Sequence, residues 1–141
     1  MTRRLRLSVA QMGGVAPDEP REAVVARLVA LLLQAQAQGS DLVVYPELAL
    51  TTFFARYWHE DRADVDHWFE REMPSDATRP LFDAARTAGI GFSLGYAELT
   101  EDGRRFNTTV VVDAGGAIVG KYRKIHVPGH VEPRTDVEHQ H

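Results

Sequence analysis

The chain has 141 residues, of which 44% are hydrophobic and 26% are charged. This is the composition of a globular domain and excludes a disordered or low-complexity chain. The formal net charge of −4 disfavours general binding to nucleic acid or to an anionic membrane, because both of these are negatively charged. The sequence contains no cysteine, which excludes disulfides, thiolate metal sites and a cysteine nucleophile within these 141 residues.

The N-terminal pattern does not match a signal peptide. The apolar stretch from Leu5 to Ala10 is short, and Arg6 and Ser8 interrupt it. No segment approaches the roughly 18 to 20 consecutive apolar residues of a membrane span. We therefore expect a cytoplasmic protein with neither a membrane nor a nucleic-acid partner.

The first third of the chain predicts a strand, a helix and a second strand. Residues 5–12 alternate apolar and polar side chains, which is typical of a strand. Apolar residues recur at helical spacing across residues 24–35, and Gly39 is placed to end that helix. Residues 41–45 form a short, almost continuously apolar run, which predicts a buried strand. This order predicts an α/β fold in which helices cover a sheet.

The remaining elements are predicted from shorter patterns. Two short helices are expected at residues 64–72 and 76–87. Three further strands are expected at residues 90–99, 106–112 and 117–122, and the glycines of the first indicate a close approach to its backbone.

Glu47 is the first candidate for chemistry, because it directly follows the predicted buried strand. Sites in α/β proteins gather at the carboxyl ends of strands. The apolar run at residues 48–54 is expected to desolvate this carboxylate, raise its pKa and make it a usable general base. A solvated glutamate at a strand end is the alternative, and position alone favours it.

The basic cluster at residues 121–126 is the second candidate. A lysine close to a carboxylate can stabilise a developing oxyanion, although a solvated basic face is the more common role of such a cluster. His126 and His130 are spaced to bind a metal only in a helix, and the intervening Pro128 and Gly129 disfavour a helix. We therefore predict no metal site.

Aromatic residues concentrate between residues 53 and 69. We favour a role in the core or in a subunit contact. The functional alternative is a hydrophobic wall beside Glu47.

Two segments resemble the N-terminal motifs of the carbon–nitrogen hydrolase (nitrilase) superfamily, namely residues 44–51 (VYPELALT) and 120–126 (GKYRKIH). Within that superfamily, the chain most resembles the N-carbamoyl-D-amino acid hydrolases. The segments that carry this closer resemblance are residues 46–54, 89–92, 94–99, 105–108 and 121–130. The resemblance covers essentially the whole chain, and its specificity comes from the order and spacing of the segments.

The resemblance implies a fold and an activity. The chain would form the N-terminal part of a four-layer α-β-β-α sandwich and contribute to a Glu-Lys-Cys triad. Glu47 matches the general base, and Lys124 matches the lysine that holds the tetrahedral intermediate. His126 and His141 match two histidines on the substrate side. The reaction would convert an N-carbamoyl-D-amino acid to the D-amino acid, carbon dioxide and ammonia in a homo-oligomer, without metal or organic cofactor.

The triad's cysteine belongs to the half of such hydrolases that would follow residue 141. We therefore interpret residues 1–141 as a single, C-terminally truncated domain. We expect this chain alone to be inactive, and either poorly soluble or self-associating. Two alternatives stay open. One is another amidohydrolase of the superfamily, of the β-ureidopropionase or aliphatic amidase type, and the other is a truncated chain with no catalytic role.

Overall fold

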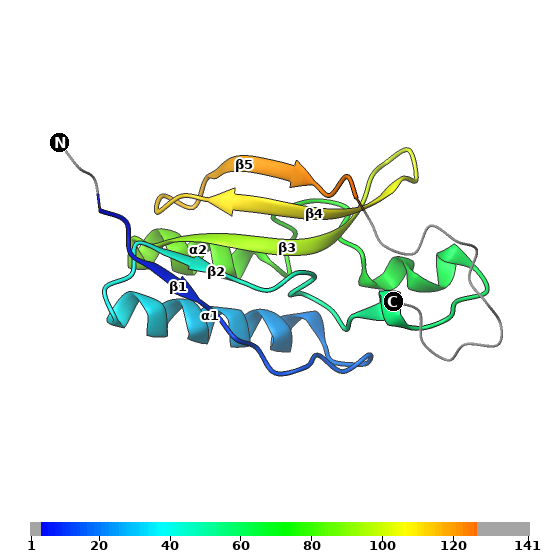
Figure 1. The fold of residues 1–141 in the computed structure, drawn as a ribbon, viewed down its shortest axis with the longest axis horizontal. Coiled ribbons are helices and arrows are strands. Elements are labelled where there is room, and N and C mark those ends of the chain that lie inside the picture. Colours follow the sequence, from blue (N-terminus) through cyan, green and yellow to red (C-terminus); the bar gives the residue numbers. More distant parts are fainter. Residues whose placement is uncertain (1–3, 127–141) are drawn as a thin grey trace.

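Five strands form one mixed sheet in the computed structural model, which describes residues 4–126. Their bounds are Leu7–Val9 (β1), Leu42–Val44 (β2), Gly91–Leu99 (β3), Arg105–Val112 (β4) and Ile118–Arg123 (β5). The strands lie side by side in chain order, β1-β2-β3-β4-β5 (Figure 1). β1, β2 and β3 are parallel, whereas β3, β4 and β5 are joined as antiparallel neighbours.

Two α-helices connect the parallel strands. α1 (Arg21–Ala37) joins β1 to β2, and α2 (Arg79–Ala88) precedes β3. Parallel neighbours need crossovers of this kind, because a tight turn cannot reverse the chain twice. The long connection from β2 to α2 also contains two 3₁₀ helices, η1 (Phe54–Arg56) and η2 (Arg62–Trp68).

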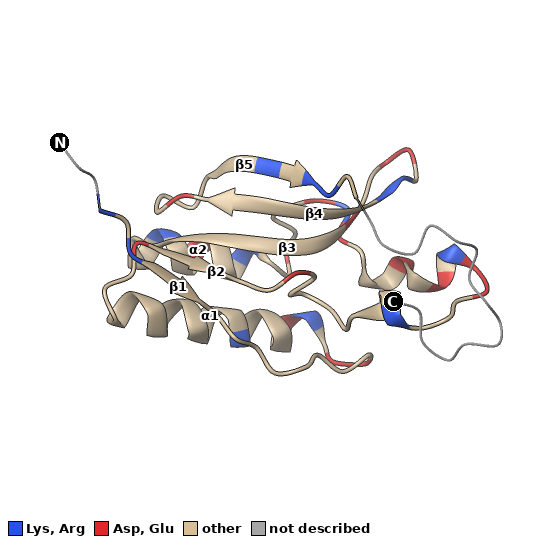
Figure 2. Cartoon of the chain, in the orientation of Figure 1, with Lys and Arg blue, Asp and Glu red and all other residues tan. Residues whose placement is uncertain are grey.

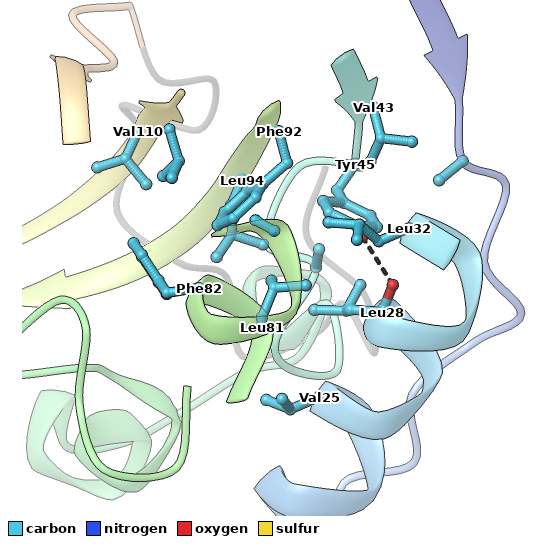
Figure 3. Close-up of a cluster of buried hydrophobic side chains, with 14 of the residues drawn as sticks. Val25, Leu28, Leu32, Val43, Tyr45, Leu81, Phe82, Phe92, Leu94 and Val110 are labelled. Carbon is cyan, nitrogen blue, oxygen red and sulfur yellow. Dashed lines mark hydrogen bonds between the residues drawn. The ribbon is translucent and has the colours of Figure 1, made fainter. Parts of the chain in front are cut away.

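The hydrophobic core lies between one face of the sheet and the two helices, as Figure 3 shows. Leu28 and Leu32 of α1 and Leu81 of α2 pack toward Phe92 and Leu94 of β3, and all five are fully buried. Burial on this scale is the main stabilising contribution to the fold. The predicted α/β architecture, with helices covering a sheet, is confirmed.

No described helix covers the opposite face of the sheet. Leu7 and Val9 of β1 are 56% and 82% exposed, and Tyr122 of β5 is 57% exposed. Within residues 4–126, neither α-helix is long and apolar enough to cross a membrane.

Three predicted elements differ from those observed. The strand expected at residues 5–12 is paired only over Leu7–Val9, because β2 offers three partners before its chain turns away. The helix expected at residues 64–72 is the 3₁₀ helix η2, which ends before Phe69 because Glu70 joins the sheet by a bridge to Glu98. The helix expected at residues 76–87 begins three residues later, at Arg79.

Candidate active site

Glu47 sits in a tight turn that directly follows β2. Two backbone hydrogen bonds to β3 flank it, from Tyr45 N–H to the Ser93 carbonyl and from Ala49 N–H to the Gly95 carbonyl, each 2.9 Å long. Leu48 adopts a left-handed backbone conformation with φ 50°, which is unusual for a residue with a side chain. The buried Leu48 side chain holds this conformation in place.

Gly95 of β3 makes room for this turn. A Cβ atom at Gly95 would lie 3.0 Å from the Pro46 carbonyl oxygen and 3.1 Å from Glu47 Cα. Both neighbours are backbone atoms and have little freedom to retreat. The glycines noted in this strand from sequence therefore mark a close backbone approach, as predicted, and the approaching segment carries Glu47.

Lys124 meets Glu47 at the opposite end of the described sequence. Its Nζ donates a hydrogen bond of 2.6 Å to Glu47 Oε1. Asn107 of β4 donates a second one, 2.5 Å long, from its side-chain amide to the same oxygen. The Asn107 carbonyl also accepts the Lys124 backbone N–H at 2.8 Å. Asn107 thus touches both partners of the ion pair.

The hydrogen bond from the Lys124 ammonium lowers the pKa of Glu47 below its ordinary value, and the bond from Asn107 adds to this effect. Burial acts in the opposite direction but is outweighed. The raised pKa expected from the apolar run at residues 48–54 is therefore wrong. The Glu47 side chain is 46% exposed, so desolvation is modest, whereas the cation is in direct contact.

Glu47, Asn107 and Lys124 lie in an open cleft of about 520 Å³ on the face of the sheet that the helices leave uncovered. His126 and Tyr122 line the same cleft. The sequence-predicted residues Glu47, Lys124 and His126 therefore share one site, whereas His141 lies outside the described residues.

The aromatic residues expected as a possible wall beside Glu47 are not among the described lining of this cleft. They pack on one another instead. The ring of Phe54 stacks on that of Trp68 with centroids 5.4 Å apart, and Phe69 contacts Phe54 at 5.3 Å.

The basic side chains of residues 121–126 bind two different carboxylates and do not form a solvated face. Lys124 binds Glu47, whereas Lys121 and Arg123 bind Glu98. Figure 2 shows the basic positions gathered toward the end of β5. The geometry thus distinguishes Lys124 from its neighbour Lys121.

The sequence alone does not single out Asn107. It lies in the segment at residues 105–108 that resembles the family, but a polar residue in a strand carries no other signal of a site. Its contact with Glu47 spans 60 positions of the chain and depends on how β4 pairs with β3.

Comparison with known proteins gives one family. The family model described as carbon-nitrogen hydrolase matches residues 6–140. A protein named nitrilase from Pyrococcus abyssi is 38% identical over 97 residues, which are 69% of this chain and 35% of that protein. The human protein named omega-amidase NIT2 is 27% identical over 133 residues, which are 91% of this chain and 44% of that protein.

Solved structures give the same fold. An amidase from a Nesterenkonia species superposes with a TM-score of 0.70 at 20% identity, over 89% of this chain and 44% of that one. A carbon-nitrogen hydrolase from Helicobacter pylori superposes with a TM-score of 0.69 at 24% identity, over 88% of this chain and 40% of that one. The chain therefore has a nitrilase-like α/β fold, consistent with part of an α-β-β-α sandwich, and spans less than half the length of these proteins.

Proposed function

Because this chain belongs to the carbon–nitrogen hydrolase family, we propose that it supplies the general base and the oxyanion-stabilising cation of a hydrolase acting on non-peptide C–N bonds. The observation that carries this proposal is the 2.6 Å contact between Glu47 and Lys124, which are 77 positions apart in the chain and meet in an open cleft. An acid–base pair with access for a small molecule is what such a reaction requires.

Glu47 is the proton carrier in this proposal. Lys124 lowers its pKa, so the carboxylate is ionised at neutral pH and can accept a proton. That proton would come from a cysteine thiol outside these 141 residues. The thiolate would attack the carbonyl carbon, and the C–N bond would break as Glu47 returns the proton to the leaving nitrogen. Glu47 would then deprotonate a water molecule that attacks the S-acyl intermediate, which is an S-carbamoyl group for a ureido substrate. The C–S bond would break as the cysteine leaves and takes back the proton from Glu47.

Lys124 is the electrostatic partner. As the thiolate adds to the carbonyl carbon, negative charge develops on the oxygen, and an ammonium group within the cleft compensates this charge. The same cation keeps Glu47 ionised between turnovers. His126 lines the cleft and is proposed to contact the substrate, and His141 is proposed for the same role from the sequence resemblance alone.

For the substrate, we propose N-carbamoyl-D-amino acids. Support comes from the segments at residues 46–54 and 121–130, which resemble N-carbamoyl-D-amino acid hydrolases. The named relatives include nitrilases and an omega-amidase, and they favour nitriles or amides as the second candidate class. The other alternative is an amidohydrolase of the same superfamily, either of the aliphatic amidase type or of the β-ureidopropionase type, which would act on a β-ureido acid.

The test is ammonia release by the protein expressed from its complete reading frame. The panel contains N-carbamoyl-D- and N-carbamoyl-L-amino acids, a β-ureido acid, aliphatic amides and nitriles. We expect the fastest release from the N-carbamoyl-D-amino acids. Faster release from an amide or a nitrile would replace the substrate class, and no release from any member would support a chain without a catalytic role.

A further inference from the structure

The side chains of consecutive residues at the end of β5 point to opposite faces of the sheet. Lys121 and Arg123 contact Glu98, whereas Lys124 contacts Glu47 in the cleft. Side chains in a strand alternate between faces, so Lys124 reaches the cleft only if Arg123 points away from it. The Lys124 backbone N–H still bonds to Asn107 of β4, which extends the ladder by one residue past Arg123.

Glu98 of β3 binds side chains from two other strands, β4 and β5. Its side chain is 8% exposed. Its Oε1 accepts hydrogen bonds from Lys121 Nζ at 2.5 Å and from Arg123 Nη2 at 2.8 Å, and its Oε2 accepts from Arg123 Nε at 2.8 Å. Thr108 of β4 donates its hydroxyl to Oε2 at 2.7 Å. Forked arginine–carboxylate pairs of this kind fix orientation as well as distance.

Hydrophobic burial does little to set the register of β5. It is an edge strand among the described elements, its residues are exposed or half-buried, and Val119 is 62% exposed. A bulge at Val111/Val112 already shifts its pairing with β4. In a strand without a buried face, register is weakly specified, and a slip of one residue would turn Lys124 toward the helices.

We propose that Glu98 is a positioning residue, which holds Lys121 and Arg123 on the helix-covered face and thereby directs Lys124 to Glu47 on the cleft face. Glu98 itself lies on the opposite face of the sheet and touches none of the reacting groups. The importance of this role for catalysis rests on the proposed function, but the placement of Lys124 does not.

The test reads the Glu47–Lys124 contact directly and without turnover, in the protein expressed from its complete reading frame. The pKa of the Glu47 carboxyl is measured by carbon-detected NMR in the wild type, Glu98→Gln and Lys124→Met. Lys124→Met removes the cation and therefore gives the largest rise in the Glu47 pKa that loss of this contact can cause. We expect Glu98→Gln to raise the Glu47 pKa toward that limit, because Lys124 is no longer held in place.

Glu70→Gln is the matched control. Glu70 is as buried as Glu98 and lies beside it, but its side chain binds Arg21 at 2.6 Å and Ser75 at 2.8 Å instead of β5. We expect the Glu47 pKa to be unchanged in this variant. An equal rise in Glu70→Gln would show a general loosening of the sheet and overturn the proposal.

If Glu98→Gln does not fold, Arg123→Lys provides a second test of the proposal. It keeps the positive charge but loses the forked contact, at a residue on the exposed edge of the sheet. A rise in the Glu47 pKa supports the proposal, and an unchanged pKa in a folded Arg123→Lys or Glu98→Gln chain overturns it. Failure of ammonia release by the complete protein would leave these results unaffected, so the two proposals fail separately.

Discussion

Glu47 receives two short hydrogen bonds on the same carboxylate oxygen, one from Lys124 and one from Asn107. Both favour the ionised form, and Lys124 has the larger effect on the pKa. We expect Asn107→Ala to raise the Glu47 pKa and Lys124→Met to raise it further, as measured by NMR titration. Thr109→Ala is the control, because Thr109 lines the same cleft without a hydrogen bond to Glu47 in the described contacts. A larger shift from Asn107→Ala than from Lys124→Met would contradict this ranking.

Glu98 makes the folding stability of the chain depend on pH. Its hydrogen bonds with Arg123, Lys121 and Thr108 outweigh burial and lower its pKa from 4.5 to about 2. A carboxylate whose pKa is lower in the folded chain stabilises the fold above its ordinary pKa, and this stabilisation disappears as the pH falls from 4.5 toward 2. The shift corresponds to a contribution on the order of 3 kcal/mol at neutral pH, before screening of the partly exposed Lys121 and Arg123.

Urea unfolding measures this contribution. We expect Glu98→Gln to unfold at lower urea than the wild type at pH 7, with the difference shrinking as the pH is lowered through the window between 4.5 and 2. A difference independent of pH would mean that Glu98 acts through packing rather than charge.

The two central residues of the site could be predicted from sequence, and their supporting residues could not. Glu47 and Lys124 lie in motifs that resemble those of a known family. Asn107 and Glu98 act through contacts between strands, so their roles follow from register, which the pattern of one strand does not contain. The direction of the Glu47 pKa shift cannot be predicted from the residues around Glu47 for the same reason, since it depends on a cation far along the chain.

At the level of elements, the turn after β2 and its contact with β3 position Glu47. We expect Gly95→Ala to destabilise the chain by about 1–3 kcal/mol, because the new methyl group would press on the backbone of Pro46 and Glu47. Gly120→Ala is the matched control in β5, where a Cβ atom would meet the Val111 side chain at an ordinary 3.7 Å. Equal unfolding free energies for the two variants would contradict the close approach at Gly95.

The long elements were predicted well, and the short ones less so. α1, β3 and β4 have extended periodic patterns, and the predicted helix-ending role of Gly39 agrees with its φ of 76° just after α1. The short helix expected at residues 64–72 is the 3₁₀ helix η2, because three apolar residues suit either helix type and do not fix where the helix ends. The strand expected at residues 5–12 is longer than β1, because alternation in one strand does not reveal how short its partner is.

The whole molecule has one helix-covered sheet face and one face open in the described part. The open face includes Leu7 and Val9, which are more than half exposed. Such a face associates readily with other apolar surfaces. We expect the isolated 141-residue chain to self-associate in sedimentation velocity experiments and Val9→Lys to reduce this. Leu33→Lys is the control, since Leu33 is 48% exposed but lies on α1. If both variants reduce self-association equally, the reduction comes from the change in net charge and not from the open face.

The most direct test of the site compares ammonia release by three variants of the protein expressed from its complete reading frame. We expect Glu47→Gln and Lys124→Met to lose on the order of a thousandfold or more in turnover, as members of one catalytic unit do. Lys121→Met should stay within about tenfold of the wild type, because its partner is Glu98 rather than Glu47. Near-normal turnover in Glu47→Gln, or a greater loss in Lys121→Met than in Lys124→Met, would contradict the assignment of this ion pair to catalysis.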